Sequence, residues 1–470
     1  MNAVATISRT PGKDHVQIRP AARQAVRSAQ SSRQSRLLAW IVAIAVFMPY
    51  TVGIFIGETK LTAAKIVLLV LLGPALARFA KDVGEHRRRV MASDVLATAT
   101  AIWLVAAPII VAGSAATVSV TSQALEFFGS YVIGRIFLSQ PATLRSFCKA
   151  LGPIGIVLLG FAILDEVSER FYVLGLTAGL FGVAGAGMEI GDDHVYRAFM
   201  GHNFFRATAT LDHPILYGSF CCCAATIQLF TEPKLTKRVV YTALLFIGCF
   251  LSMSSAPLIA FLFAIAMAGF DAVLKRYPLR WRLLTCLALG GFGGLSLASD
   301  NPFTWFIRNL TLDPHSGYFR LMIWDAAFEQ IGKLPIFGNG FAKTGNYILD
   351  ATVDCLWLAR AINYGLPLIV FFLLAIVCAL VPVAGQARSP AVPPELRRVR
   401  AAFSIMLVLM LFTSFTVYFW NGMWVFLCMC IGIRVSLKEM TWFAIKQKKT
   451  WAAGTAPHRV PAINRELLVA

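Results

Sequence analysis

Residues 366–381 read LPLIVFFLLAIVCALV and contain no charged side chain. They lie within a longer apolar run, 355–383, in which Arg360 is the one charged residue. A helix of about 20 predominantly apolar residues is long enough to cross the hydrocarbon core of a bilayer. The run therefore predicts a membrane-spanning helix.

The whole chain has this apolar character. Of its 470 residues 57% are hydrophobic and only 14% are charged, and the mean hydropathy is +0.68. Soluble domains have roughly 25% charged residues. The apolar runs are continuous and rich in aromatic residues, which excludes disordered, collagen-like and coiled-coil chains. The ten cysteines mostly lie in these runs, where cysteine behaves as a small hydrophobic residue. The composition thus predicts a polytopic membrane protein.

The apolar runs predict an all-α fold with about twelve transmembrane helices, in a single transmembrane domain over residues 37–437. The fourth span is interrupted by Glu126 and Arg135. Two basic tails flank this domain, a disordered one at 1–36 and a second at 438–470. The predicted spans are 38–56, 61–78, 95–113, 117–138, 146–165, 214–230, 239–252, 256–270, 283–299, 355–383, 402–419 and 421–436.

The lysine and arginine residues lie unevenly between the two sides of this arrangement. With the amino terminus inside, the cytoplasmic segments hold 32 of them and the outer segments hold 8. Because cytoplasmic segments of membrane proteins are enriched in Lys and Arg, both termini are predicted to be cytoplasmic. The formal net charge of +19 then reflects topology and attraction to anionic lipid. It gives no reason to predict nucleic-acid binding.

Two predicted outer connections, near 166–213 and 300–354, are much longer than the others. Long connections in a compact protein are usually functional or disordered. These two are rich in aromatic residues and contain four of the seven histidines. We therefore expect large outer loops that contain short helices and pack on the membrane surface.

The end of the first loop places three polar side chains at the boundary between water and membrane. Its sequence, FFRATATLDHPIL, contains Arg206, Asp212 and His213 before Pro214 begins the next span. A cation, a carboxylate and an imidazole are thus available together.

The second loop contains the helix-like stretch GYFRLMIWDAAFEQIGKLPIFGNGF, residues 317–341. Arg320, Trp324 and Phe328 recur every four residues, so they share one helix face. Pro335 and the glycines that follow predict a turn after the helix. An amphipathic helix that presents an arginine beside aromatic rings is suited to an anionic head group.

Three stretches resemble the bacterial O-antigen ligase and polysaccharide polymerase family, whose members are multi-span inner-membrane glycosyltransferases with a large periplasmic loop late in the chain. RATATLDHPILYG, 206–218, is similar to the family's arginine followed by small residues and a His/Asn-Pro pair. YFRLMIWDAAFEQIGKLPIFGNG, 318–340, matches its Arg, Trp and P-x-x-G-x-G pattern. VDCLWLARAINYGLPLIVFF, 353–372, is similar to the stretch that closes on Tyr-Gly at the start of a span.

One position departs from the ligase pattern. Counted back without gaps from Tyr364 and Gly365, the place that the ligases fill with histidine is Asp354, and the following asparagine is Cys355. This departure favours an exopolysaccharide polymerase, in which a carboxylate is the base, over a lipopolysaccharide ligase.

The resemblance implies glycosyl transfer from an undecaprenyl-pyrophosphate-linked glycan at the periplasmic face of the bacterial inner membrane. Arginine pairs with phosphate groups in a bidentate manner and keeps its charge, so Arg206, Arg320 and Arg360 are the expected pyrophosphate ligands. Asp354 is the first candidate for the general base. His213 and Asp212 are the second. No metal and no cofactor are expected, and polysaccharide export or chain-length components are further candidate partners.

Other interpretations of the same residues remain open. The arginines also suit interfacial anchors, Asp354 suits a helix cap or a partner of Arg360, and His213 suits a residue that begins a helix. The GDDH stretch, 191–194, reads as a loop turn, and LGGFGG, 289–294, as close helix packing rather than a dinucleotide site. An O-antigen ligase, a transporter or flippase of lipid-linked glycan, and a structural partner of an export complex are the alternative functions.

Overall fold

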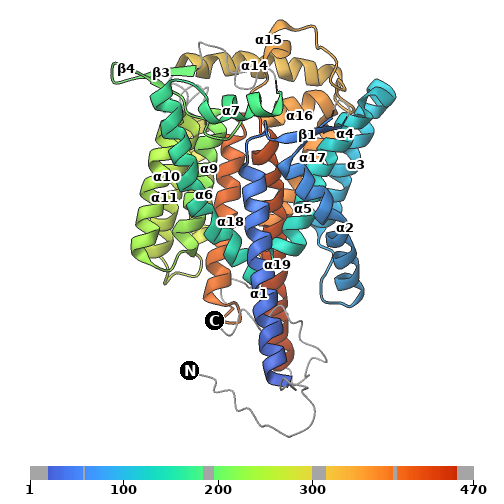
Figure 1. Cartoon of the computed structure of the whole chain (residues 1–470), viewed down its shortest axis with the longest axis vertical. Helices are drawn as coiled ribbons and strands as arrows, with labels where there is room; N and C mark the ends of the chain where they lie inside the picture. Colours follow the sequence, from blue (N-terminus) through green and yellow to red (C-terminus); the bar gives the residue numbers. More distant parts are fainter. Residues whose placement is uncertain (1–19, 57–58, 184–194, 299–313, 385–388, 453–470) are drawn as a thin grey trace, which may run out of the picture.

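A computed structural model describes residues 20–56, 59–183, 195–298, 314–384 and 389–452. These residues are mostly helical, with two short antiparallel hairpins. Figure 1 shows long helices running side by side, with the start of α1 (Pro20–Phe47) and the last turns of α19 (Asn421–Ala452) at one end of the bundle. We call the opposite end, which α14 (Pro314–Lys333) lies across, the distal end.

Helices of very different lengths make up most of the described chain. The other long helices are α2 (Ala63–Gly84), α3 (Ala92–Ala112), α6 (Pro141–Ser168), α9 (Pro214–Thr231), α10 (Leu235–Leu251), α11 (Ser255–Val273), α12 (Arg280–Ala298), α17 (Leu366–Leu380) and α18 (Pro394–Thr413). The segment after α3 comprises η1 (Gly113–Ala116), α4 (Thr117–Ala124), the π-helical turn η2 (Leu125–Gly129), α5 (Ser130–Ile133) and the π-helical turn η3 (Gly134–Leu138). The short helices are α7 (Tyr172–Phe181), α15 (Tyr347–Ala351) and α16 (Leu356–Tyr364).

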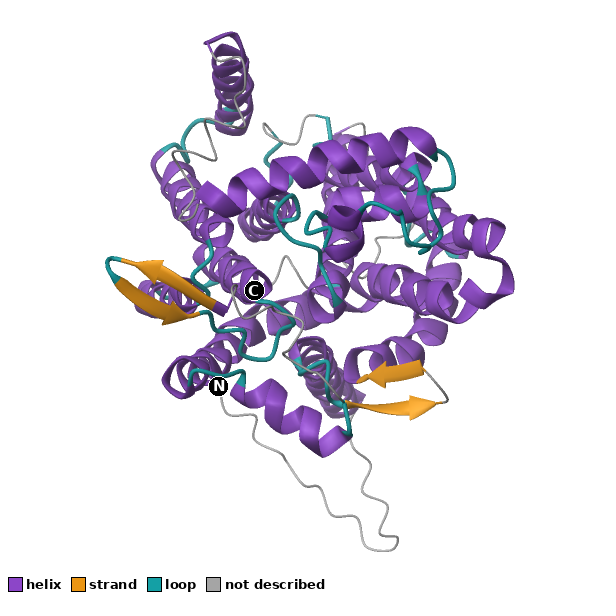
Figure 2. Ribbon diagram, turned by 90° about the horizontal axis from the view of Figure 1, so that it is seen from above, coloured by secondary structure: helices purple, strands orange, loops and turns teal. Residues whose placement is uncertain are grey.

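The two hairpins project at the margins of the bundle when it is viewed from the distal end (Figure 2). In the first, β1 (Gly53–Ile56) pairs with β2 (Thr59–Thr62), and in the second β3 (Tyr196–Phe199) pairs with β4 (His202–Phe205). The all-α prediction thus holds for the bundle and misses these strands, which are too short to give a clear alternating pattern.

Five described helical segments are long and apolar enough to cross a membrane. The chain is therefore a membrane protein, and the count of twelve spans and the orientation stay predictions. The five segments are Ala63–Gly84, Ala92–Leu138, Pro141–Ser168, Pro214–Thr231 and Ser255–Val273.

The structure differs from several of the predicted boundaries, among them the end of the predicted span 402–419, since α18 already ends at Thr413. Helix α1 already begins at Pro20, so the part of the predicted disordered tail that is described is helical. The first predicted span ends at Phe47, because the chain turns there toward β1. The predicted span 355–383 is divided into α16 and α17 at Gly365, whose φ of +80° does not fit a helix.

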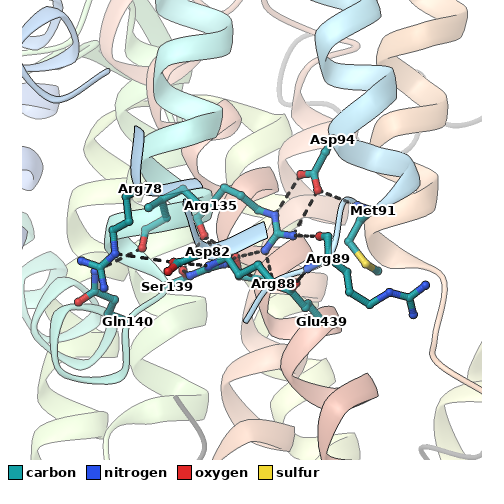
Figure 3. A network of polar contacts seen from close by, with 12 residues as sticks. Arg78, Asp82, Arg88, Arg89, Met91, Asp94, Arg135, Ser139, Gln140 and Glu439 are labelled. Atoms are coloured by element: carbon teal, nitrogen blue, oxygen red, sulfur yellow. Dashed lines mark hydrogen bonds and ion pairs between the residues drawn. The ribbon is translucent and has the colours of Figure 1, made fainter. Parts of the chain in front are cut away.

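Buried charges lie on the side of the bundle away from the distal end, where the connection after α2 meets η3 and α19 (Figure 3). Arg135 donates to Asp94 at 3.0 Å and to Glu439 at 2.6 Å, and Arg88 donates to Glu439 at 3.4 Å. Burial lowers the pKa of Arg88 to about 10, which leaves it protonated at neutral pH. Buried ions are tolerated when paired and hydrogen-bonded, so this network fixes η3 against α19.

The Tyr131 hydroxyl completes this network, since it donates to Asp94 at 2.6 Å. We expect Tyr131→Phe to lower the free energy of unfolding by about 2 kcal/mol, because a bond to a buried charged group is lost. The measurement is the thermal midpoint of the detergent-purified protein. Tyr241→Phe is the matched control, since no hydrogen bond of the Tyr241 hydroxyl occurs among the described residues. Equal midpoints for the two variants would contradict the expectation.

Candidate functional site

Two of the three motif stretches pack directly against each other at the distal end. The turn after α14 donates from Asn339 N to Ile362 O at 2.6 Å and from Gly340 N to Asn363 O at 3.1 Å. Leu366 N in turn donates to Pro335 O at 2.8 Å. The P-x-x-G-x-G turn and the Asn-Tyr-Gly stretch therefore form one backbone-bonded unit.

Glycine is required where these two stretches meet. A Cβ added to Gly365 would lie 1.9 Å from Ile336 O, and one added to Gly338 would lie 2.5 Å from Ile362 O. Both glycines also have φ angles near +70° to +80°, which other residues rarely adopt. The motif glycines thus allow the close approach that positions α16.

Trp103, the one aromatic residue of α3, supports this unit. The Trp103 indole donates to Tyr364 O at 2.9 Å and stacks on the Phe337 ring with centroids 5.5 Å apart. The turn and the end of α16 are consequently anchored to a long helix of the bundle.

Helix α14, which contains Arg320, packs against the start of α16. Its buried residues Ile323, Ala327 and Ile331 form a small hydrophobic cluster with Cys355 and residues of α15 and α16. The charges of Arg320 and Asp354 both act on the Cys355 thiol. The structure therefore confirms the predicted helix and its following turn.

The half-buried Asp354 carboxylate precedes α16 and accepts a hydrogen bond from the Thr352 hydroxyl at 2.6 Å on Oδ1. Since Cys355, and not Asp354, occupies the capping position of α16, the interpretation of Asp354 as the cap of that helix does not hold.

Arg360 lies in α16 and is almost fully buried. Its Nη1 donates to Gln123 Oε1 at 2.5 Å and to the Tyr364 hydroxyl at 3.3 Å, so these groups are its partners and not Asp354. The guanidinium also lies over three aromatic rings, at 4.6 Å from Trp424, 5.2 Å from Tyr418 and 5.4 Å from Tyr364. Cation–π contacts of this kind hold a desolvated guanidinium in a fixed orientation.

The non-helical stretch between α18 and α19 contributes to the site, although the sequence alone assigns most of it to the predicted span 402–419. The Ser414 side chain accepts from the Trp357 indole at 2.8 Å. Phe415 contacts both Trp357 and Trp324, with centroids 6.1 and 6.0 Å apart. The stretch therefore joins α14 to α16.

The first motif stretch approaches the site from the other side. His213 caps α9, with Nδ1 accepting from Ile215 N at 3.1 Å, and its ring lies 6.2 Å from that of Trp420. Trp420 in turn contacts Tyr418, which lies over Arg360. Asp212 accepts from the Asn421 amide at 2.6 Å. These contacts fit the interpretation of His213 as a helix-beginning residue and also link it to Arg360 through two aromatic rings.

Arg206 is buried and donates from Nη2 to the Ser254 hydroxyl at 3.0 Å, in the connection between α10 and α11. Its backbone N–H donates to Val195 O at 2.8 Å. The contacts of Arg206 are thus with the α9–α11 side of the distal end, while Arg320 and Asp354 gather at α16.

Asp165, which the sequence motifs do not include, holds the first motif stretch in place. This fully buried carboxylate accepts backbone N–H groups of Tyr172 at 2.9 Å, Ala209 at 2.9 Å and Thr208 at 3.2 Å. Ala209 has a left-handed φ of +54°, which these bonds stabilise. An acidic residue near the end of an apolar run was the available sequence signal.

We expect Asp165→Asn to lower the free energy of unfolding by about 2 kcal/mol, because the amide presents a donor to backbone N–H groups that need an acceptor. Activity should fall as well, since the segment from Arg206 to His213 loses its anchor. The thermal midpoint in detergent measures the first effect. Asp271→Asn, which breaks an ion pair with Arg280, is the matched control. A smaller loss for Asp165→Asn than for the control would refute this role.

Within the residues that the structure describes, no group of three or more His, Cys, Asp or Glu side chains could hold a metal ion. Asp192, Asp193 and His194 of the GDDH stretch lie outside the described residues. The absence of a metal and a cofactor stays a prediction from the sequence.

The protein is thus a membrane protein with a polar candidate site at its distal end. Buried charged side chains and aromatic rings form this site. A family model described as O-antigen ligase matches residues 240–373, which include α14, the turn after it and α16. This match confirms the resemblance to the O-antigen ligase and polymerase family. It supports a ligase- or polymerase-type function in glycan biosynthesis, and members of the family are membrane glycosyltransferase-like enzymes. The comparison with curated proteins gives no match.

Proposed function

We propose that the protein polymerises undecaprenyl-pyrophosphate-linked oligosaccharide repeat units of a surface polysaccharide or exopolysaccharide. The observation on which this proposal depends is that α14, which contains Arg320, packs against the start of α16, which Asp354 precedes and which contains Arg360. The reaction must stabilise negative charge on the leaving group and remove a proton from the acceptor. A pair of cations suits the first demand, and a carboxylate suits the second.

In the proposed reaction the acceptor hydroxyl oxygen attacks the anomeric carbon of the donor glycan. The bond from that carbon to the pyrophosphate oxygen breaks, and the lipid pyrophosphate leaves with the electron pair. Arg320 and Arg360 offset the negative charge that develops on it, which is worth most where water is excluded. Asp354 takes the proton of the acceptor hydroxyl through Oδ2, the oxygen that does not accept from Thr352.

The test uses purified protein in detergent with an undecaprenyl-pyrophosphate oligosaccharide, without nucleotide sugar and with EDTA. The expected result is a ladder of longer lipid-linked products on a gel. Asp354→Asn should lower the rate by about 10²–10⁴-fold, the usual contribution of a general base. His213→Asn should lower it less if Asp354 is the base. Tight binding of the lipid with no product from any acceptor would favour a transporter.

A ligase is the second candidate, because the matching family model is described as O-antigen ligase. The same assay distinguishes the two reactions when a lipid-anchored oligosaccharide acceptor is added. Product on that acceptor, without longer donor-linked chains, would replace the polymerase proposal with the ligase.

A further inference from the structure

Cationic side chains gather on the side of the bundle away from the distal end, where α18 and α19 pack beside the last turn of α17. Arg434 of α19 donates from Nε to the Ser404 hydroxyl of α18 at 2.7 Å and from Nη2 to Leu380 O of α17 at 3.2 Å. Arg400, one turn before Ser404 in α18, donates from Nη1 to the Thr441 hydroxyl of α19 at 2.9 Å. These hydrogen bonds hold cations of two helices against the end of a third.

A third cation, Lys438, lies one turn after Arg434 on the same face of α19. Its Nζ donates to Cys378 O, which also belongs to the last turn of α17. The carbonyl groups at the end of a helix carry a partial negative charge of about half an elementary charge in total. They therefore orient the three cations without neutralising them. We call Arg400, Arg434 and Lys438 the basic cluster.

The acidic residues of the same helices are paired with other cations. Helices α17, α18 and α19 contain two acidic residues, Glu395 and Glu439. Glu395 lies 3.1 Å from the Arg145 guanidinium, and Glu439 lies 2.6 Å from that of Arg135. Within the described part of the chain, no member of the basic cluster forms an ion pair. The cluster therefore keeps its positive charge.

Arg434 is the most deeply buried member of the basic cluster, with an exposed fraction of 2%. Its Nη1 is buried and has no hydrogen-bond partner among the described residues. The positive charges of Arg400 and Lys438 act on it as repulsion. A buried cation without a counter-charge is costly, and a buried donor without an acceptor is a common place for a bound ion. An anion held by the basic cluster would offset both costs.

The surface beside the basic cluster is apolar. Leu373, Val377 and Val381 recur every four residues along α17 and are 42%, 43% and 48% exposed. An exposed apolar stripe on a helix of a membrane protein suits contact with lipid chains. Val381 directly follows Leu380, whose carbonyl accepts from Arg434. Basic pockets between membrane helices bind phosphate-containing head groups of lipids. The arrangement thus suits a phosphate that is attached to apolar chains.

We propose that Arg400, Arg434 and Lys438 form a binding site for the phosphate group of an anionic phospholipid, whose acyl chains lie along the exposed apolar stripe of α17. The site lies away from α16 and does not depend on the proposed reaction. A bound head group would link the ends of α17, α18 and α19. Free inorganic phosphate offers the same chemistry to the three cations, and the experiment separates the two sources.

The experiment measures equilibrium binding of a fluorescent phosphatidylglycerol to the full-length protein in a non-ionic detergent. Lys438→Gln and Arg400→Gln should each weaken binding by about tenfold, because a hydrogen bond to a charged group is lost. Arg398→Gln is the matched control, since it removes an exposed cation two positions from Arg400 in α18. It should bind as the unaltered protein does. Unlabelled phosphatidylcholine should not compete, because its head group has no net charge.

Thermal midpoints with and without phosphatidylglycerol distinguish a binding site from a purely structural cluster. The lipid should raise the midpoint of the unaltered protein and of Arg398→Gln, but not that of Lys438→Gln, because a ligand stabilises only a state that binds it. An equal rise in Lys438→Gln would overturn the proposal, as would equal weakening by Arg398→Gln or equal competition by phosphatidylcholine. Competition by inorganic phosphate as strong as that of the lipid would support the anion site and overturn its assignment to a phospholipid.

Discussion

Arg320→Ala is expected to abolish polymer formation while the protein stays folded in the membrane. Removal of one group that stabilises developing charge typically lowers the rate by about 10²–10³-fold. Arg320 should show an effect of this size because its charge and that of Asp354 both act on Cys355 at the start of α16. The substitution leaves in place the buried apolar face of α14, which is formed by Ile323, Ala327 and Ile331.

The measurement is the initial rate of chain extension at saturating lipid-linked substrate, together with the elution profile and thermal midpoint. Lys333→Ala on the last turn of the same helix is the control. Its ion pair with Glu329 is exposed, so its loss should change neither rate nor midpoint. Arg320→Lys should recover part of the rate, because lysine supplies the charge without the bidentate fork. A normal polymer length distribution in Arg320→Ala would exclude Arg320 from the reaction.

The positions of Arg320 and Arg360 illustrate how far the sequence alone could reach. Spacing of four residues was sufficient to predict α14, because helix periodicity depends only on neighbours in the chain. The following turn was predictable from Pro335 and the glycines after it for the same reason. Arg360 was identified as an ion within an apolar run, but its partner was not. Gln123 comes from a helix 237 positions earlier, and pairing at such a separation depends on tertiary packing.

Asp165 and Lys65 show what could not be predicted. Each lies at one end of a long apolar helix, where a charged residue usually marks the membrane boundary. Only the fold shows that Asp165 accepts from the first motif stretch and that Lys65 faces Glu126. The division of the span 355–383 escaped prediction because hydropathy is continuous across Gly365. The break depends on the close contact with Ile336.

Gly365→Ala is expected to destabilise the protein more than either Tyr131→Phe or Asp165→Asn. An added Cβ would lie 1.9 Å from Ile336 O, and the φ of +80° is itself unfavourable for alanine. The backbone conformation alone, with φ +80° and ψ 172°, is essentially restricted to glycine and accounts for about 1–3 kcal/mol. The overlap with a backbone carbonyl must be relieved by movement of the 335–340 turn, so we expect a total above about 4 kcal/mol.

Gly345→Ala separates the two contributions. Gly345 has a similar φ of +76°, but nothing lies within 4 Å of an added Cβ. It should therefore lose only the roughly 1–3 kcal/mol of backbone strain and keep its activity. In Gly365→Ala the bond from Leu366 N to Pro335 O is broken, and α16 moves together with Arg360. Thermal midpoints in detergent and polymerisation rates of the two variants measure this difference. Equal losses would mean that backbone strain, and not the contact between the two motif stretches, makes Gly365 necessary.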